Sequence, residues 1–160
     1  MRLIGWTTTC MLALGFATAP LDAQAVGTRA PVIAVTDLDG KVVTLPTNRP
    51  ALIEFWATWC EVCEQLYPRM VAAHRQFRDR VDFYGVNVTV NESRNRVRRW
   101  VAEHQPPFRT LYDERGVAVR GFGAPATSYV VIVDGKGVIR YTGSGGTQEL
   151  SAELAKVVGR

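Results

Sequence analysis

Two cysteines three residues apart, Cys60 and Cys63, are the residues of this chain best suited to chemistry. The apolar run 51–56 precedes them and the amphipathic stretch 64–78 follows, which predicts a strand, a short turn and a helix that opens on Cys-x-x-Cys. At the helix N-cap, unpaired N–H groups and the helix dipole stabilise a thiolate and lower the thiol pKa. The pattern is typical of a redox-active dithiol, with Cys60 as nucleophile and Cys63 as resolving thiol.

Two other uses of such a pair are weaker. Half of a zinc site needs two further ligands, and the only histidines, His74 and His104, lie 30 residues apart, outside the usual close pairing. A purely structural disulfide across so short a loop restricts the unfolded chain little. We therefore expect no metal at the two cysteines and favour redox chemistry.

Glu54 is the only charged residue in the run 51–56, which otherwise predicts a strand buried on both faces. A buried carboxyl group without a cation is costly to ionise, so its pKa should rise. A glutamate that reaches solvent at a sheet edge is the alternative. We favour a proton relay between Glu54 and Cys63, because acids with perturbed pKa values cluster at active sites.

The segment 55–63, Phe-Trp-Ala-Thr-Trp-Cys-Glu-Val-Cys, resembles the active-site segment of thioredoxin-fold proteins, especially the TlpA/ResA-like thiol-disulfide oxidoreductases. Pro68 matches the proline that kinks their active-site helix, and Glu54 matches the acid beneath their disulfide. The resemblance implies protein thiols or disulfides as substrates and no organic cofactor, since the Cys60–Cys63 disulfide is the redox group. It also implies a reductant in cytochrome c maturation or metal-site assembly, supplied by a membrane-embedded electron donor.

The same resemblance implies a cis-proline just before the penultimate strand, where it would face the disulfide. A gap-free match places Ser128 there and Thr127 before it, whereas the nearest proline, Pro125, lies three residues earlier. Using Pro125 needs an insertion in a compact hairpin, so we favour Ser128, with a trans bond because a non-proline cis bond costs about 3 kcal/mol. Together with Trp59 beside the sulfurs, these residues would form the substrate-binding surface.

Two other functions use the same cysteines. A binding protein could carry Cu(I) on the two thiolates, which are soft ligands, and the missing proline would make room for the metal. No third ligand stands near them in the sequence. A peroxidase is a weaker alternative, because peroxiredoxin-like proteins have threonine three residues before the reactive cysteine, where this chain has Ala57.

Residues 1–25 have the pattern of a secretory signal peptide: a short positive start, an apolar segment and an Ala-x-Ala site. We expect cleavage before Val26, which leaves a thioredoxin-like domain over residues 26–160 in the periplasm or otherwise exported. An uncleaved membrane anchor is the alternative. Cys10 would leave with the signal, and a lone Cys-x-x-Cys pair in an oxidising compartment favours catalysis.

The rest of the chain alternates predicted strands and helices, which indicates an α/β fold with a thioredoxin-like mixed sheet, helices on both faces and an extra N-terminal β-hairpin. The predicted elements are a hairpin over 31–46, a strand over 81–88, a helix over 92–104, a hairpin over 129–141 and a helix over 148–158. The net charge of the 160 residues is only +4. Four arginines on the 92–104 helix fit a solvated face better than a nucleic-acid site.

Overall fold

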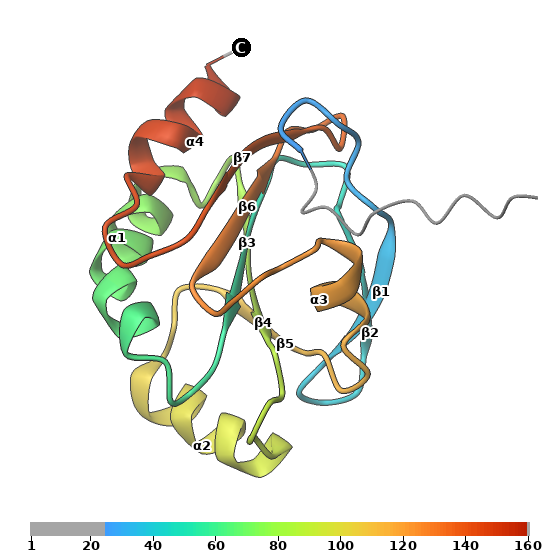
Figure 1. Cartoon of the computed structure of the whole chain (residues 1–160). Helices are drawn as coiled ribbons and strands as arrows, with labels where there is room; N and C mark the ends of the chain where they lie inside the picture. The colour runs from blue at the N-terminus through green and yellow to red at the C-terminus, as the bar shows by residue number, and fades with distance from the viewer. Residues whose placement is uncertain (1–24, 160) are drawn as a thin grey trace, which may run out of the picture.

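The computed structural model describes residues 25–159. Seven strands form one mixed sheet in the order β2-β1-β5-β4-β3-β6-β7 (Figure 1). The elements are β1 (Ile33–Asp37), β2 (Val42–Leu45), β3 (Ala51–Trp56), α1 (Glu61–Phe77), β4 (Asp82–Asn87), α2 (Arg94–His104), β5 (Arg109–Tyr112), α3 (Val117–Gly121), β6 (Tyr129–Val133), β7 (Ile139–Gly143) and α4 (Leu150–Val158).

The predicted signal peptide and Cys10 fall on the segment 1–24, outside the described residues, so the expected cleavage stays a prediction. None of the helices within residues 25–159 combines the length and the apolar character needed to cross a membrane.

β3 occupies an interior position in the sheet and carries the chain to the two cysteines. It runs parallel to β4 and antiparallel to β6, with Glu54 opposite Gly85 on one side and Val130 on the other. The predicted N-terminal hairpin is present, and β1 extends the sheet by pairing antiparallel with β5. β5 itself was not predicted, because its four residues follow two prolines and carry no clear alternation.

Helices cover both faces of the sheet, as predicted: α1 and α4 lie on one side and α3 on the other (Figure 1). On the first side Leu52 packs into a cluster with Leu66 of α1 and Leu154 of α4. On the second side Phe55 packs into a cluster with Phe122. Since successive strand residues point to opposite faces, Glu54 and Trp56 share the face of Leu52 and look toward the active-site helix.

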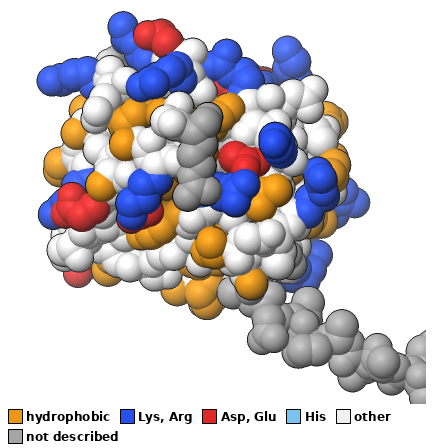
Figure 2. Space-filling model, turned by 90° about the horizontal axis from the view of Figure 1, so that it is seen from above, with side chains coloured by type: hydrophobic (Ala, Val, Ile, Leu, Met, Phe, Trp, Pro, Cys, Tyr) orange, Lys and Arg blue, Asp and Glu red, His pale blue; other side chains and the backbone are white. Residues whose placement is uncertain are grey.

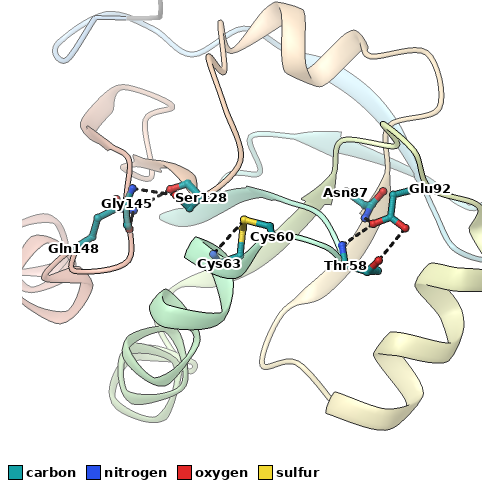
Figure 3. The surroundings of a disulfide bond; sticks show 8 residues. All are labelled: Thr58, Cys60, Cys63, Asn87, Glu92, Ser128, Gly145 and Gln148. Carbon is teal, nitrogen blue, oxygen red and sulfur yellow. Dashed lines mark hydrogen bonds between the residues drawn. A yellow bond between two sulfur atoms is a disulfide. The ribbon is translucent and has the colours of Figure 1, made fainter.

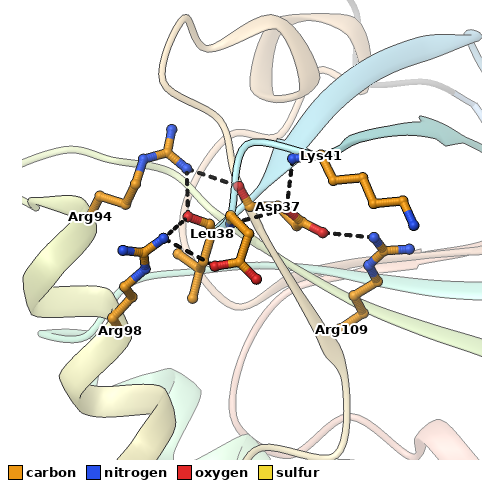
Figure 4. Close-up of polar contacts among 7 residues, drawn as sticks. Asp37, Leu38, Lys41, Arg94, Arg98 and Arg109 are labelled. Atoms are coloured by element: carbon orange, nitrogen blue, oxygen red, sulfur yellow. Dashed lines mark hydrogen bonds and ion pairs between the residues drawn. The ribbon is translucent and has the colours of Figure 1, made fainter.

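Two of the four arginines of α2, Arg94 and Arg98, contact the N-terminal hairpin (Figure 4). Arg94 donates to the carbonyl oxygen of Asp37 at 2.8 Å, and Arg98 lies 3.1 Å from the carboxylate of Asp39. In the view of Figure 2, Lys and Arg side chains are spread over the surface with acidic and apolar side chains between them. These contacts agree with the expectation that the arginines of the 92–104 helix do not form a nucleic-acid site.

Candidate redox site

The turn between β3 and α1 places Cys60 at the N-cap of the helix, as the sequence predicts. Its Sγ accepts the backbone N–H of Cys63 at 3.1 Å, and its carbonyl oxygen accepts the same N–H at 3.0 Å (Figure 3). The two side chains form a disulfide across a Cα–Cα distance of 5.2 Å. α1 begins at Glu61, directly after this cap, so both sulfurs belong to its first turn.

The disulfide lies beneath an apolar rim. Cys60 is only 4% exposed and Cys63 9%, whereas the neighbouring Trp59 is 44% exposed. Val62 and Val90 are further exposed apolar side chains on the same segment and on the loop that contacts it. A protein partner would therefore have to contact apolar surface in order to reach the sulfurs.

Glu54 is buried in β3, with 4% of its surface exposed. Burial raises the pKa of Glu54 from an ordinary value of 4.5 to about 8. Within the described residues no hydrogen bond or ion pair reaches its carboxyl group, so desolvation is not offset. The predicted rise in pKa is confirmed, and the alternative of a solvated edge glutamate is wrong because β3 lies between two other strands.

A cavity of about 270 Å³ connects Glu54 with both cysteines. Its other walls are mostly aromatic side chains: Trp56, Tyr67, Trp100, His104 and Phe108. Trp100 packs on Trp56 at a centroid distance of 4.5 Å and stacks on His104 at 4.3 Å. Both residues belong to α2, and His104 is its last residue. Their shared place in the cavity wall, however, was not predicted.

Ser128, which the gap-free match assigns to the cis-proline position of thioredoxin-like proteins, lies directly before β6. It is 1% exposed and has a left-handed backbone with φ of 60°. Its N–H donates to Phe55 O at 2.7 Å. Its Oγ accepts from Gly145 N at 3.0 Å, and its carbonyl accepts from the Gln148 side chain at 2.9 Å (Figure 3). All the hydrogen-bonding groups of Ser128 are thus engaged within the protein.

Among residues 25–159 the one cis peptide bond is Leu45–Pro46, so the bond before Ser128 is trans, as predicted, and so is the bond before Pro125. Pro125 is exposed, and neither Pro125, Thr127 nor Ser128 lines the cavity. Trp59 also lies outside the cavity, where its indole N–H donates to Val90 O at 2.8 Å. The substrate-binding role assigned to these residues stays a prediction.

A model of the AhpC/TSA family matches residues 26–142. The chain belongs to this family. Among its curated relatives, ResA of Bacillus thuringiensis subsp. konkukian, a thiol-disulfide oxidoreductase, is 27% identical over 139 residues, or 82% of this chain and 78% of ResA. The thioredoxin-like protein YneN of Bacillus subtilis is 30% identical over 71% of this chain and 68% of its own length. The predicted likeness to ResA-like thiol-disulfide oxidoreductases is thereby confirmed.

Solved structures agree on the fold. A thiol:disulfide interchange protein from Bacteroides sp. superposes with a TM-score of 0.73 at 21% identity, over 87% of this chain and 93% of that structure. A protein described as a putative DsbE from Chlorobium tepidum gives a TM-score of 0.72 at 22% identity, over 84% and 95% of the two chains. At this identity the likeness shows the thioredoxin-like fold, in line with the predicted fold class.

Sequence reasoning missed one further residue of this AhpC/TSA-family site. Glu92 accepts hydrogen bonds from Thr58, two residues before Cys60, although 34 positions separate the two residues in sequence (Figure 3). The sequence places Glu92 at the start of a predicted helix, whereas the helix is capped by Ser93. Within the described part of the chain, no three His, Cys, Asp or Glu side chains are grouped as a metal site would require.

Proposed function

We propose that this protein is an exported thiol-disulfide oxidoreductase that reduces disulfides in partner proteins. The observation that carries the proposal is the disulfide at the N-cap of α1, which shares a cavity with a buried carboxyl group whose pKa is about 8. A general acid–base group works best when its pKa is near the working pH. The relatives named as thiol-disulfide oxidoreductases support the same reaction.

The reaction starts from the dithiol. The Cys60 thiolate attacks one sulfur of a substrate disulfide, which forms a mixed disulfide and releases the other substrate sulfur as a thiolate that takes up a proton. Cys63 then loses its proton to the ionised form of Glu54 and attacks Sγ of Cys60. This step breaks the mixed disulfide, closes the Cys60–Cys63 bond and releases the second substrate sulfur as a thiolate, which takes up a proton. Two electrons have passed from the protein to the substrate.

The physiological setting follows from the family resemblance. We propose that the signal peptide directs the chain out of the cytoplasm and that a membrane-embedded donor returns two electrons and two protons to the disulfide after each turnover. Cytochrome c maturation or metal-site assembly would supply the substrate disulfides. The apolar rim at Trp59 and Val62 supports a protein rather than a small molecule as partner.

Cys60→Ser tests the reaction directly. The variant should have no reductase activity toward a protein disulfide such as those of insulin, because the attacking thiolate is lost. Reduction at the wild-type rate by the Cys60→Ser variant would rule the proposal out. Cys10→Ser in the full chain is the matched control, because it removes a cysteine that the proposed reaction does not use.

A further inference from the structure

The carboxylate of Glu92 is bound by the turn that carries Cys60. Its Oε1 accepts the backbone N–H of Thr58 at 2.5 Å, and its Oε2 accepts the Thr58 hydroxyl at 3.1 Å (Figure 3). Asn87 contributes a third, longer bond of 3.4 Å from its side-chain amide. The Glu92 side chain is 0% exposed, and its nearest cation, the half-exposed Arg96, lies 3.9 Å away. The charge is therefore held inside the protein mainly by neutral donors.

The loop between β4 and α2 is shaped to hold Glu92 in this place. Thr89 and Asn91 both have left-handed backbones, with φ of 62° and 53°, which non-glycine residues adopt only at a cost in free energy. The loop is braced by Thr89 N–H donating to Asn87 Oδ1 at 3.0 Å and by the Trp59 indole donating to Val90 O at 2.8 Å. Backbone strain of this kind is concentrated at functional sites, so the strained loop that holds Glu92 suggests that its position matters for function.

We infer that Glu92 is a positioning residue that fixes the turn before Cys60 and keeps a negative charge beside the nucleophile. The turn is short: Cys60 N–H donates to Ala57 O at 3.2 Å, and Thr58 lies two residues before the helix cap. Two residues span at most roughly 7 Å, so the carboxylate lies within roughly 10 Å of the Cys60 backbone. This inference deepens the proposed function and rests on it.

The charge should make the protein a stronger reductant. A nearby negative charge disfavours a second one, so it raises the pKa of the Cys60 thiol against the lowering effect of the helix N-terminus. Converting the disulfide into two thiols takes two electrons and two protons, and the reduced form gains stability when a thiol ionises. Because Glu92 disfavours the thiolate, it stabilises the disulfide relative to the dithiol. The reduction potential of the Cys60–Cys63 couple is therefore lower, and the dithiol is a stronger reductant.

Other titratable groups also face the cysteines, and a test of Glu92 has to leave these residues unchanged. Glu54 from β3, Glu64 and Tyr67 from α1, and His104 from α2 line the same cavity. Glu92 differs from them because hydrogen bonds tie it to the turn itself, and Arg96 is the one charged group that the structure places in an ion pair with it among residues 25–159. A variant at Glu92 that leaves the cavity wall intact isolates its contribution.

Glu92→Gln tests the inference, because it preserves the side-chain size and can still accept the Thr58 N–H, but removes the charge. The pKa of the Cys60 thiol, followed by the pH dependence of its alkylation rate, should fall by about 0.5 to 1 pH unit. The equilibrium with glutathione should move about 3- to 10-fold toward the dithiol, which corresponds to about 15 to 30 mV. If Glu92→Gln lowers the stability but leaves the thiol pKa and the reduction potential unchanged, Glu92 has only a structural role and the inference is overturned.

Two companion variants separate charge from geometry. Glu92→Asp keeps the charge but shortens the side chain, so stability should fall while the thiol pKa stays at the wild-type value. A pKa that drops in Glu92→Asp would contradict the inference even if Glu92→Gln does not fold. Asp134→Asn removes another carboxylate that accepts backbone N–H groups, in the turn between β6 and β7, and should leave the potential unchanged. Cys60→Ser tests the proposed function separately, because its outcome does not depend on Glu92.

Discussion

The sulfur of Cys60 lies 3.1 Å from the backbone nitrogen of Cys63 and accepts its N–H, so the first turn of α1 closes on the reactive atom. A sulfur in this position is stabilised as a thiolate by the helix N-terminus. Cys63 lies in the first turn of α1, and both cysteines line the cavity that holds Glu54. The N-cap position of Cys60 is the reason that the proposed mechanism gives it the attacking role and gives Cys63 the resolving role.

Cys63→Ser should trap the reaction half-way. Cys60 can still attack a substrate disulfide, but no second thiol is present to release the substrate, so a mixed disulfide accumulates. Intact-mass measurement under non-reducing conditions should show the covalent adduct with a reporter disulfide peptide. The reciprocal Cys60→Ser variant serves as the control and should form no adduct. Adducts of equal yield in both variants would contradict the assignment of roles.

Glu54→Gln should slow disulfide exchange by about 10- to 100-fold, because the amide cannot take the proton of Cys63. In the wild-type protein the rate should rise with pH through the pKa of Glu54, which is about 8. That limb of the pH–rate profile should disappear in the variant, and the remaining dependence should report the thiols. Turnover measured from pH 6 to 9 checks this, and a profile identical to the wild-type profile would remove Glu54 from the mechanism.

Glu54 should also make stability depend on pH. Its pKa is 4.5 when solvated and about 8 in the folded protein, so between these values the folded state holds a proton that the unfolded state has lost. The free energy of unfolding should accordingly fall as pH rises from 4.5 to 8, by at most about 5 kcal/mol. Denaturation of the oxidised protein at pH 5 and pH 8 should show a smaller pH dependence for Glu54→Gln. An equal dependence in both proteins would show that the carboxyl group is not desolvated as described.

Ser128→Pro should destabilise this protein, although proline is the residue that the family resemblance implies at that position. Proline fixes φ near −65°, whereas Ser128 has φ of 60°, and it cannot donate the N–H that reaches Phe55 O. We expect a loss of about 3 kcal/mol or more in the free energy of unfolding. Pro125→Ala, at an exposed site in the same loop, is the control and should stay within about 0.5 kcal/mol of the wild type. Equal stability of Ser128→Pro and the wild type would show that this backbone can rearrange.

The parts of the fold that could be predicted are those with a strong local signal. The sequence predicted a strand over 51–56, and the structure has the same ends. A single carboxyl group, Glu54, inside this apolar run was sufficient to predict its burial and its raised pKa. The two hairpins followed from turn residues between β-rich segments. β5 was missed because four residues after two prolines carry too little periodicity, and its place in the sheet depends on pairing with β1 and β4.

The parts of the site that could not be predicted depend on contacts between distant segments. Glu92 and Thr58 meet because β3 and β4 are adjacent parallel strands whose carboxyl ends share one edge of the sheet. Trp100 and His104 have helical spacing, but only packing of α2 against Trp56 brings them to the cavity. At Ser128 the gap-free match predicted a departure from the family, whereas its left-handed backbone and its hydrogen bonds to Gly145 and Gln148 could be seen only in the structure.

The redox potential of the Cys60–Cys63 couple tests the central claim most directly. The mature protein would be equilibrated in glutathione or dithiothreitol buffers and the dithiol fraction counted by thiol alkylation. A reductant should have a potential of about −270 mV, close to that of thioredoxin. A value of about −120 mV, typical of a strong oxidant, would mean that the protein donates its disulfide to partners and would contradict the proposed direction of electron flow.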